Sequence, residues 1–231
     1  LMRFDRMALA MTQAYLFKSG PATILPGGLH GYVKSRPELA VPDLQFLFRG
    51  TAPGAHLWFP GIKKAYTEGF GMRPVLLHPE SRGQVTLRSN NPRDKVRIFQ
   101  NFFASPNDLP ILREGVKRIR DIINQPAMDA RRGAELAPGP DCQTDDQVDE
   151  FIRKTAITAH HPSCTCQMGA SEDCVLDSEL KVRGIENLRV IDASAMPDLV
   201  SGNINAAVLM IAEKGAAMVR GETPLPSAEA A

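Results

Sequence analysis

The sequence predicts an α+β fold in which strands precede helices and a last strand–helix unit closes the chain. Three observations predict it. Strand-like runs are concentrated before residue 104, helical spacing follows at 107–124 and 144–156, and a short apolar run at 188–191 leads into an apolar helix at 201–221. The 231 residues are 43% hydrophobic, which is enough for a packed core in one large domain or two small ones. The last unit is expected to join a sheet whose other strands lie outside this chain.

The first hundred residues predict a helix, a loop and then strands. The stretch 7–11 is apolar and helix-prone, whereas "KSGPATILPGG" is rich in Gly and Pro and predicts a loop. Residues 43–50 alternate as a strand does. Three further runs at 75–77, 84–88 and 96–100 are strand-like, with the turn sequence "SNNPRD" between the last two. We expect these three runs to form an antiparallel hairpin or meander.

Two amphipathic helices are predicted next. Segment 107–124 carries apolar residues at helical intervals, at Leu112, Val116, Ile119 and Ile123. Segment 144–156 opens with Thr144 and has Gln147 three residues later, which is the pattern of a capping box.

The end of the chain predicts one strand and one long helix. The strand runs from Leu188 to Ile191 and ends at Asp192. The helix spans 201–221, and Gly221 is placed as its carboxy-end cap. Its apolar face is formed by Ile204, Val208, Ile211 and Met218. Residues 222–231 are small and Pro-rich, which predicts a disordered tail.

Charge and hydropathy exclude several classes of partner. A net charge of +1, from 27 basic and 26 acidic residues, argues against nucleic acid as a partner. No apolar run approaches the ~20 residues that a transmembrane helix needs, and no signal peptide is recognisable. We therefore expect a cytoplasmic protein, free or associated with a membrane.

The four cysteines form no framework of pairs. Cys142, Cys164, Cys166 and Cys174 lie late in the chain, which favours a reduced, intracellular setting. A zinc site built on the C-x-C pair would need two more ligands at regular spacing. Cys174 and His161 are poorly spaced for that role, so small buried thiols are expected and a metal site is not.

His161 is the first candidate for chemistry. It follows His160, and Pro162 restricts it to an extended backbone. Small neighbours leave room for a ligand, and an imidazole can accept a proton near neutral pH, as a general base must. The alternative is a histidine satisfied by backbone groups in a loop.

The segment "SGNIN" at the start of the last helix is the second candidate. Helix starts present unpaired N–H groups and the positive end of the dipole, which suit an anion or a developing negative charge. Asn203 could simply cap the helix, although Asn203 and Asn205 together exceed what capping needs. Asp192 is the third candidate, because polar residues at strand carboxyl ends often line ligand crevices. Its alternative is an ordinary turn residue.

Three segments, in this order, resemble the glucose–methanol–choline (GMC) oxidoreductases, which depend on FAD. They are "HPESRGQVTLRSNNPRDKVRI", "HHPSCTCQMG" and "VLDSELKVRGIENLRVIDASAMPDLVSGNINAAVLMIAEKGAAMVRG". The motif "HPSCTCQMG" and the "GN-x-NA" pattern are most similar to those of the choline dehydrogenase-like members. The resemblance is strong over 75–221 and looser over 1–74, through "GPATILPGG" and "PDLQFLF".

The resemblance implies two domains. Residues 1–180 would form the substrate-binding domain, an antiparallel sheet with flanking helices. Residues 181–221 would supply the last strand and helix of a Rossmann-like FAD-binding domain, followed by the tail at 222–231. The family opens with G-x-G-x-x-G, a fingerprint that this chain lacks. We therefore expect a carboxy-terminal fragment, inactive alone, whose partner is the amino-terminal FAD-binding half.

The resemblance also implies the reaction, in which a small-molecule alcohol is oxidised to an aldehyde or ketone by hydride transfer to FAD. His161 matches the family's catalytic histidine, and Asn203 matches the second active-site position, which orients the alcohol oxygen. Both need to reach one oxygen at about 3 Å, although they lie 42 positions apart. Contacts with the cofactor are assigned to Asp192, Ala193, Asn203, Ile204, Asn205 and Ala206.

Two other functions remain open at this stage. One is a non-catalytic binding module derived from the same family. The other is a flavin lyase on the same scaffold, which the choline dehydrogenase-like motifs disfavour. The alcohol, the choice between oxidase and dehydrogenase, and the mode of FAD attachment are also open.

Overall fold

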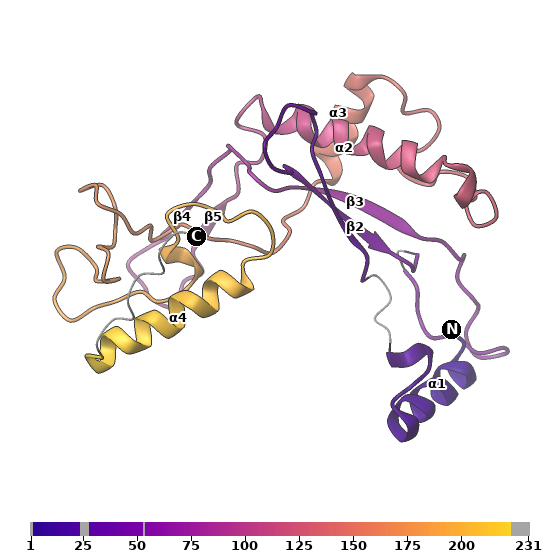
Figure 1. Ribbon diagram of the computed structural model, residues 1–231, viewed down its shortest axis with the longest axis horizontal. Helices are drawn as coiled ribbons and strands as arrows, with labels where there is room; N and C mark the ends of the chain where they lie inside the picture. The colour runs from indigo at the N-terminus through magenta and orange to yellow at the C-terminus, as the bar shows by residue number, and fades with distance from the viewer. Residues whose placement is uncertain (1, 24–27, 53, 223–231) are drawn as a thin grey trace. The chain divides into compact units, whose positions relative to one another are not determined.

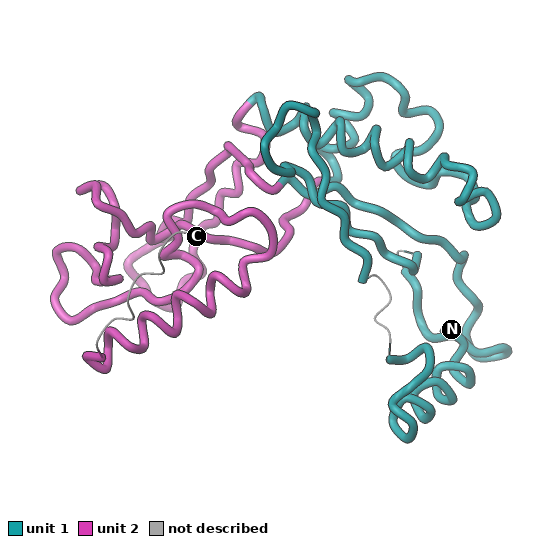
Figure 2. Tube along the Cα trace, in the orientation of Figure 1, with its two compact units in different colours: residues 1–76, 106–155 teal, residues 77–105, 156–231 magenta. Residues whose placement is uncertain are grey.

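The computed structural model describes residues 2–23, 28–52 and 54–222. Within these residues it forms four α-helices and two antiparallel sheets, which confirms the predicted α+β class (Figure 1). Contacts divide the chain into two compact units (Figure 2). Unit 1 comprises residues 1–76 and 106–155, and unit 2 comprises residues 77–105 and 156–231. Each unit is described by itself below.

The sheet of unit 1 has three strands in the order β1-β2-β3. They are β1 (His30–Val33), β2 (Leu44–Arg49) and β3 (Gly71–Leu76). The prediction of β2 is confirmed, whereas β1 was not predicted. The run at 75–77 forms the end of β3, which pairs with β2 in register Leu44↔Leu76. The expected meander of all three runs is therefore wrong, because β2 provides β3 with a longer antiparallel partner.

Helix α2 (Asp108–Ile123) packs on this sheet through a glycine. A Cβ at Gly115 would lie 2.7 Å from Pro74 Cβ, closer than side chains can approach. The absence of that atom lets the helix lie against β2 and β3, where Leu44 is fully buried.

Helix α3 (Asp145–Thr155) lies beside α2 (Figure 1). Its predicted capping box is confirmed, since Gln147 N donates to Thr144 Oγ1 at 3.3 Å and Thr144 N donates to Gln147 Oε1 at 2.9 Å. Arg113 of α2 then donates through Nε and Nη2 to the two oxygens of Asp149, each at 2.6 Å. The two helices are therefore joined by a bidentate ion pair.

The first segment of unit 1 forms helix α1 (Phe4–Phe17), followed by a short 3₁₀ turn, η1 (Pro21–Thr23). Backbone bonds tie it to residue 58: Phe4 N donates to Trp58 O at 2.9 Å and Trp58 N donates to Met2 O at 3.1 Å. Several large apolar side chains of α1 are exposed, Leu9 and Tyr15 most of all at 76% and 77%.

Unit 2 contains one hairpin and one long helix. Strands β4 (Gln84–Thr86) and β5 (Arg97–Phe99) pair as predicted, and helix α4 spans Asn205–Arg220. Gly221 ends α4 in the left-handed conformation, which confirms the predicted cap. The core of the unit is a cluster of five buried residues, Leu176, Leu180, Ala195, Met196 and Ile211.

The strand predicted at 188–191 is not formed. Only Arg189 makes a bridge there, an isolated one with Lys181. Ile191 instead packs against α4, where a Cβ on Gly215 would lie 2.5 Å from Ile191 Cγ2. One bridge cannot build the continuous ladder of a strand.

Two predictions about organisation stay open. The described part of the chain places residues 156–180 in the same contact unit as the segment after 181, but a contact unit does not define an evolutionary domain. The boundary at 180, and the assignment of 181–221 to a Rossmann-like domain, therefore remain predictions. The tail predicted as disordered lies outside the described residues from 223 onward.

Candidate functional site

The structure brings the side chains of His161 and Asn203 together. Asn203 Nδ2 lies 3.1 Å from His161 Nε2, although the two residues are 42 positions apart. His161 is half-buried and Asn203 is exposed, so neither side chain is sealed in the interior. The two side chains that the family resemblance expects to act on one oxygen are thus neighbours within unit 2.

The segment after His161 is held by a run of backbone hydrogen bonds. The N–H groups of alternate residues donate to three consecutive carbonyls at 3.2, 2.9 and 3.0 Å, in the pairs Cys164–Ala193, Cys166–Ser194 and Met168–Ala195. Because Ala195 and Met196 belong to the buried cluster, these bonds fix the histidine segment to the core of the unit.

Two left-handed residues flank His161. His160 has φ 62° and Cys164 has φ 67°, which are uncommon values for residues other than glycine. The N–H of His160 donates to Thr158 Oγ1 at 3.0 Å, which supports the first of these turns. His161 therefore lies between two residues with left-handed backbone conformations. Such costly conformations often occur at functional sites.

Asn203 reaches the imidazole from the start of α4. Gly202 has φ 107°, a conformation that glycine adopts without cost, and the N-cap residue is Ile204 rather than Asn203. The alternative in which Asn203 simply caps the helix is thus not what the structure shows. Its amide is turned toward His161 instead.

The amide contact suits an imidazole that accepts a hydrogen bond. An Asn Nδ2 group can only donate, so the contact is a hydrogen bond when His161 Nε2 carries a lone pair. An imidazole with a lone pair on that nitrogen can accept a proton.

The remaining residues predicted at the helix start are accessible. Asn205 and Ala206 are exposed in the first turn of α4, whereas Ile204 is half-buried against the core cluster. The first N–H groups of a helix lack partners within that helix. This end of α4 can therefore receive an anionic or electron-rich ligand.

Asp192 is a turn residue, which was the alternative to its lining a ligand crevice. Its Oδ1 accepts hydrogen bonds from Ser194 N at 2.7 Å and from Ser194 Oγ at 2.5 Å, at the start of the 3₁₀ turn η3 (Ala193–Ala195). Asp192 is exposed, and Ala193 packs on the core cluster. Any contact of these two residues with a cofactor is additional to that structural role.

Among the residues that the structure describes, no group of three or more His, Cys, Asp or Glu side chains could hold a metal ion. All four cysteines are half-buried free thiols rather than the fully buried ones expected. The same part of the chain contains no helix long and apolar enough to cross a membrane.

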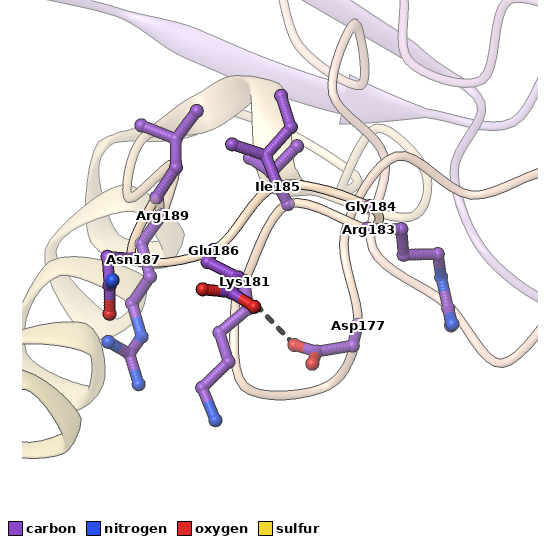
Figure 3. Close-up of a pocket in the computed structure, with 10 residues that line it drawn as sticks. Asp177, Lys181, Arg183, Gly184, Ile185, Glu186, Asn187 and Arg189 are labelled. Atoms are coloured by element: carbon purple, nitrogen blue, oxygen red, sulfur yellow. Dashed lines mark hydrogen bonds between the residues drawn. The ribbon is translucent and has the colours of Figure 1, made fainter.

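A surface hollow of about 530 Å³ lies over the loop 177–189 (Figure 3). None of its lining residues is a candidate site residue. Two of its arginines support the loop, since Arg183 donates to Gly169 O at 2.8 Å and Arg189 donates to Glu179 O at 3.2 Å. Lys181 N donates to Asp177 Oδ1 at 2.9 Å across the same loop. We interpret the hollow as the outside of a well-bonded loop.

Comparisons with known proteins agree on one family. The sequence profile described as GMC oxidoreductase matches residues 79–212. An oxygen-dependent choline dehydrogenase of Pseudomonas fluorescens is 44% identical over 200 residues, covering 87% of this chain and 35% of its own length. A protein of the same description from Cronobacter sakazakii is 42% identical over 211 residues, covering 91% and 37%. The chain thus spans just over a third of these curated relatives.

Solved structures give the same result. A pyridoxine 4-oxidase from Mesorbium loti superposes with a TM-score of 0.71 at 28% identity, over 84% of this chain and 38% of its own. A formate oxidase of Aspergillus oryzae superposes with a TM-score of 0.79 at 24% identity, over 94% and 42%, which supports the fold alone. An FAD-dependent oxidoreductase from Chaetomium thermophilum matches with a TM-score of 0.64 at 27% identity, over 78% and 28%.

Proposed function

Because this chain belongs to the GMC oxidoreductase family, we propose that it is the carboxy-terminal part of an FAD-dependent enzyme that oxidises a small-molecule alcohol to an aldehyde or ketone. The observation that carries the proposal is the 3.1 Å approach of His161 and Asn203 beside the open start of α4. Choline is the first alcohol to test, since the curated relatives are choline dehydrogenases.

His161 and Asn203 have complementary roles toward the alcohol oxygen. His161 Nε2 takes the hydroxyl proton, and Asn203 Nδ2 donates a hydrogen bond to the same oxygen. In the structure these two atoms contact each other, so the substrate oxygen would enter between them and replace that contact. An imidazole with a lone pair on Nε2 and an amide donor suit this exchange, because one accepts a proton while the other only donates.

The residues at the start of α4 fit an FAD ring. Asn205 and Ala206 would hold it through their backbone N–H groups, with Asp192 and Ala193 along its edge. The fit rests on the chemistry of these donors, since an exposed helix start favours a ligand that gains negative charge. When bound, FAD supplies the acceptor for the hydride of the alcohol.

A further part of the protein is proposed to cover this site. Helix α4 exposes large apolar side chains, with Leu209 and Met210 at 58% and Val219 at 62%. Such side chains favour burial against another element. An amino-terminal FAD-binding half is the proposed partner, with residues 1–180 as the substrate-binding domain and 181–221, which include helix α4, as the last segment of the FAD-binding domain.

The proposal is tested by flavin reduction in the full-length FAD-loaded protein, in which this chain is joined to the proposed amino-terminal half. Choline and a panel of aliphatic, aromatic and furanic alcohols are mixed anaerobically with the protein, and flavin absorbance is followed by stopped flow. We expect at least one alcohol to reduce the flavin, and His161→Ala to slow that reduction by about 10²-fold or more. His160→Ala is the matched control, because it removes an adjacent exposed imidazole that lies outside the pair. Equal slowing by both variants, or none by His161→Ala, would reject the role of His161.

A further inference from the structure

An ion pair outside the proposed machinery joins two distant stretches of unit 2. Arg82 Nη2 lies 3.0 Å from Asp198 Oδ1, across 116 positions of sequence. Arg82 belongs to the "HPESRG" motif before β4, and Asp198 lies between the core cluster and α4. The contact therefore connects the hairpin segment with the chain that leads to Asn203.

Asp198 occupies the loop that positions Asn203. This loop leaves the core at Met196, which is 2% exposed, and reaches α4 after Asn203. Asp198 Oδ1 also accepts from Leu199 N at 2.8 Å, which fixes the direction of the chain at that point. On the other side, the amide of Gln167 donates to Pro197 O, so the base of the loop is also tied to the histidine segment.

The arginine is itself well anchored. Its Nη1 donates to Pro79 O at 2.5 Å, and its carbonyl accepts from Asn101 Nδ2 at 2.9 Å. Ser105 N donates to Ser81 Oγ at 3.0 Å and closes the same segment. These bonds fix Arg82 relative to the hairpin, so the ion pair can hold Asp198 in place.

Exposure decides what the pair can contribute. The side chains of Arg82 and Asp198 are 61% and 73% exposed, and ion pairs that open to water add little to global stability. Their geometric effect is larger, because Asp198 lies only five positions before Asn203 in a loop with a flexible glycine at 202. Small displacements of an orienting group lower rates strongly.

We propose that Arg82 and Asp198 are positioning residues that hold the 197–203 loop so that the Asn203 amide reaches His161 and the substrate oxygen. The inference rests on the proposed function for its catalytic consequence. Its structural part concerns only the distance between Asn203 and His161, which can be followed with or without an alcohol.

The kinetic test is a double-mutant cycle in the FAD-loaded protein. Arg82→Ala should slow flavin reduction by about 10-fold while substrate affinity changes little. In an Asn203→Ala background the same change should have no further effect, because the group that it positions is gone. Asp198→Asn keeps the size of the side chain and should reproduce the result if Arg82→Ala folds poorly. Exchange of the two charges, Arg82→Asp with Asp198→Arg, should recover most of the rate.

A second readout does not depend on turnover. In the full chain labelled with ¹⁵N, the side-chain NH₂ protons of Asn203 should show a nuclear Overhauser contact with the His161 ring, and Arg82→Ala should abolish that contact. Lys181→Ala is the matched control, since it removes another exposed ion pair of unit 2, with Glu179. Two results would each overturn the inference. One is equal slowing by Arg82→Ala with and without Asn203, and the other is an Asn203–His161 contact that persists in Arg82→Ala. If no alcohol reduces the flavin, the proposed function fails while the NMR contact still tests the positioning role.

Discussion

Unit 1 and unit 2 are built by different means. Unit 1 rests on a three-stranded sheet, a helix pair and the bidentate Arg113–Asp149 bridge. Unit 2 has a two-stranded hairpin and one helix, and its chain from 160 to 200 is held by isolated bridges, turns and a five-residue core. The His161–Asn203 pair lies in the less regular unit. Irregular backbone frees polar groups from ladders and lets them face a ligand.

The backbone conformations sharpen this contrast. Unit 2 contains left-handed residues other than glycine on both sides of His161, whereas the described strands of unit 1 are regular. Such conformations are costly and persist where the surroundings impose them. In unit 2, such turns therefore lie on both sides of the histidine at which chemistry is proposed.

After His161→Ala, the largest effect is expected from Asn203→Ala. Asn203→Ala should slow flavin reduction by about 10–100-fold, since the alcohol oxygen loses its positioned donor. Ser201→Ala is the matched control near the same helix start, because it removes an exposed polar side chain that has no proposed role in the site. Stopped-flow reduction of the FAD-loaded protein measures both. Similar slowing by the two variants would contradict a specific role for the Asn203 amide.

The next effect is expected where a helix glycine lies against a neighbouring side chain, once in each unit. In unit 1, Gly115→Ala places a Cβ 2.7 Å from Pro74 Cβ. In unit 2, Gly215→Ala places a Cβ 2.5 Å from Ile191 Cγ2. Overpacking of this kind costs about 1–3 kcal/mol. Thermal unfolding should show a lower midpoint for both variants, and Gly215→Ala should also weaken the His161–Asn203 contact because α4 must shift. Unchanged midpoints would show that the helices do not depend on these glycines.

A smaller effect is expected from the bridge between α2 and α3. Arg113→Ala leaves Asp149, which is 19% exposed, without its bidentate donor. We expect a loss of about 1–2 kcal/mol in unfolding free energy, measured with urea. Flavin reduction should remain unchanged at temperatures where the protein is folded. A slowed flavin reduction would contradict the expectation that this bridge affects stability alone.

The smallest effect concerns the loss of stability at low pH. In unit 2, hydrogen bonds from the N–H groups of Lys181 and Glu179 lower the pKa of Asp177 below its ordinary value of 3.8. In unit 1, the hydrogen bond from Lys117 lowers the pKa of Asp145 in the same direction. A carboxylate with a lowered pKa stabilises the fold above the ordinary value, and this stabilisation is lost as pH falls through the folded pKa.

Asp177→Asn and Asp145→Asn should therefore lower the thermal midpoint slightly at pH 6. The difference from the unsubstituted protein should disappear as the solution is acidified well below pH 3.8. Differential scanning at several pH values measures it. A difference that grows on acidification would have the wrong sign for this explanation.

The sequence predicted local structure better than pairing. Helix α4, strand β2 and the Thr144–Gln147 capping box depend on neighbours within a few positions, and all three are confirmed. Strand β1 has four residues and exists because β2 offers it a partner, which no local pattern reveals. The strand at 188–191 was wrong for the converse reason, since Ile191 packs on α4 instead of joining a ladder.

The candidate site shows the same limit. The helix start and the imidazole could be recognised as chemically useful from their own residues. Their meeting over 42 positions could not, and it was expected only through the family resemblance. Arg82 and Asp198 were missed, because an exposed arginine in a turn has no periodicity to distinguish it. The only available signal was its place in the "HPESRG" motif.

The most direct measurement is the coupling between His161 and Asn203 during flavin reduction by an alcohol. If both act on one oxygen, the variant carrying His161→Ala and Asn203→Ala should reduce the flavin scarcely more slowly than His161→Ala alone. A double variant whose slowing equals the product of the two single effects would contradict a shared site.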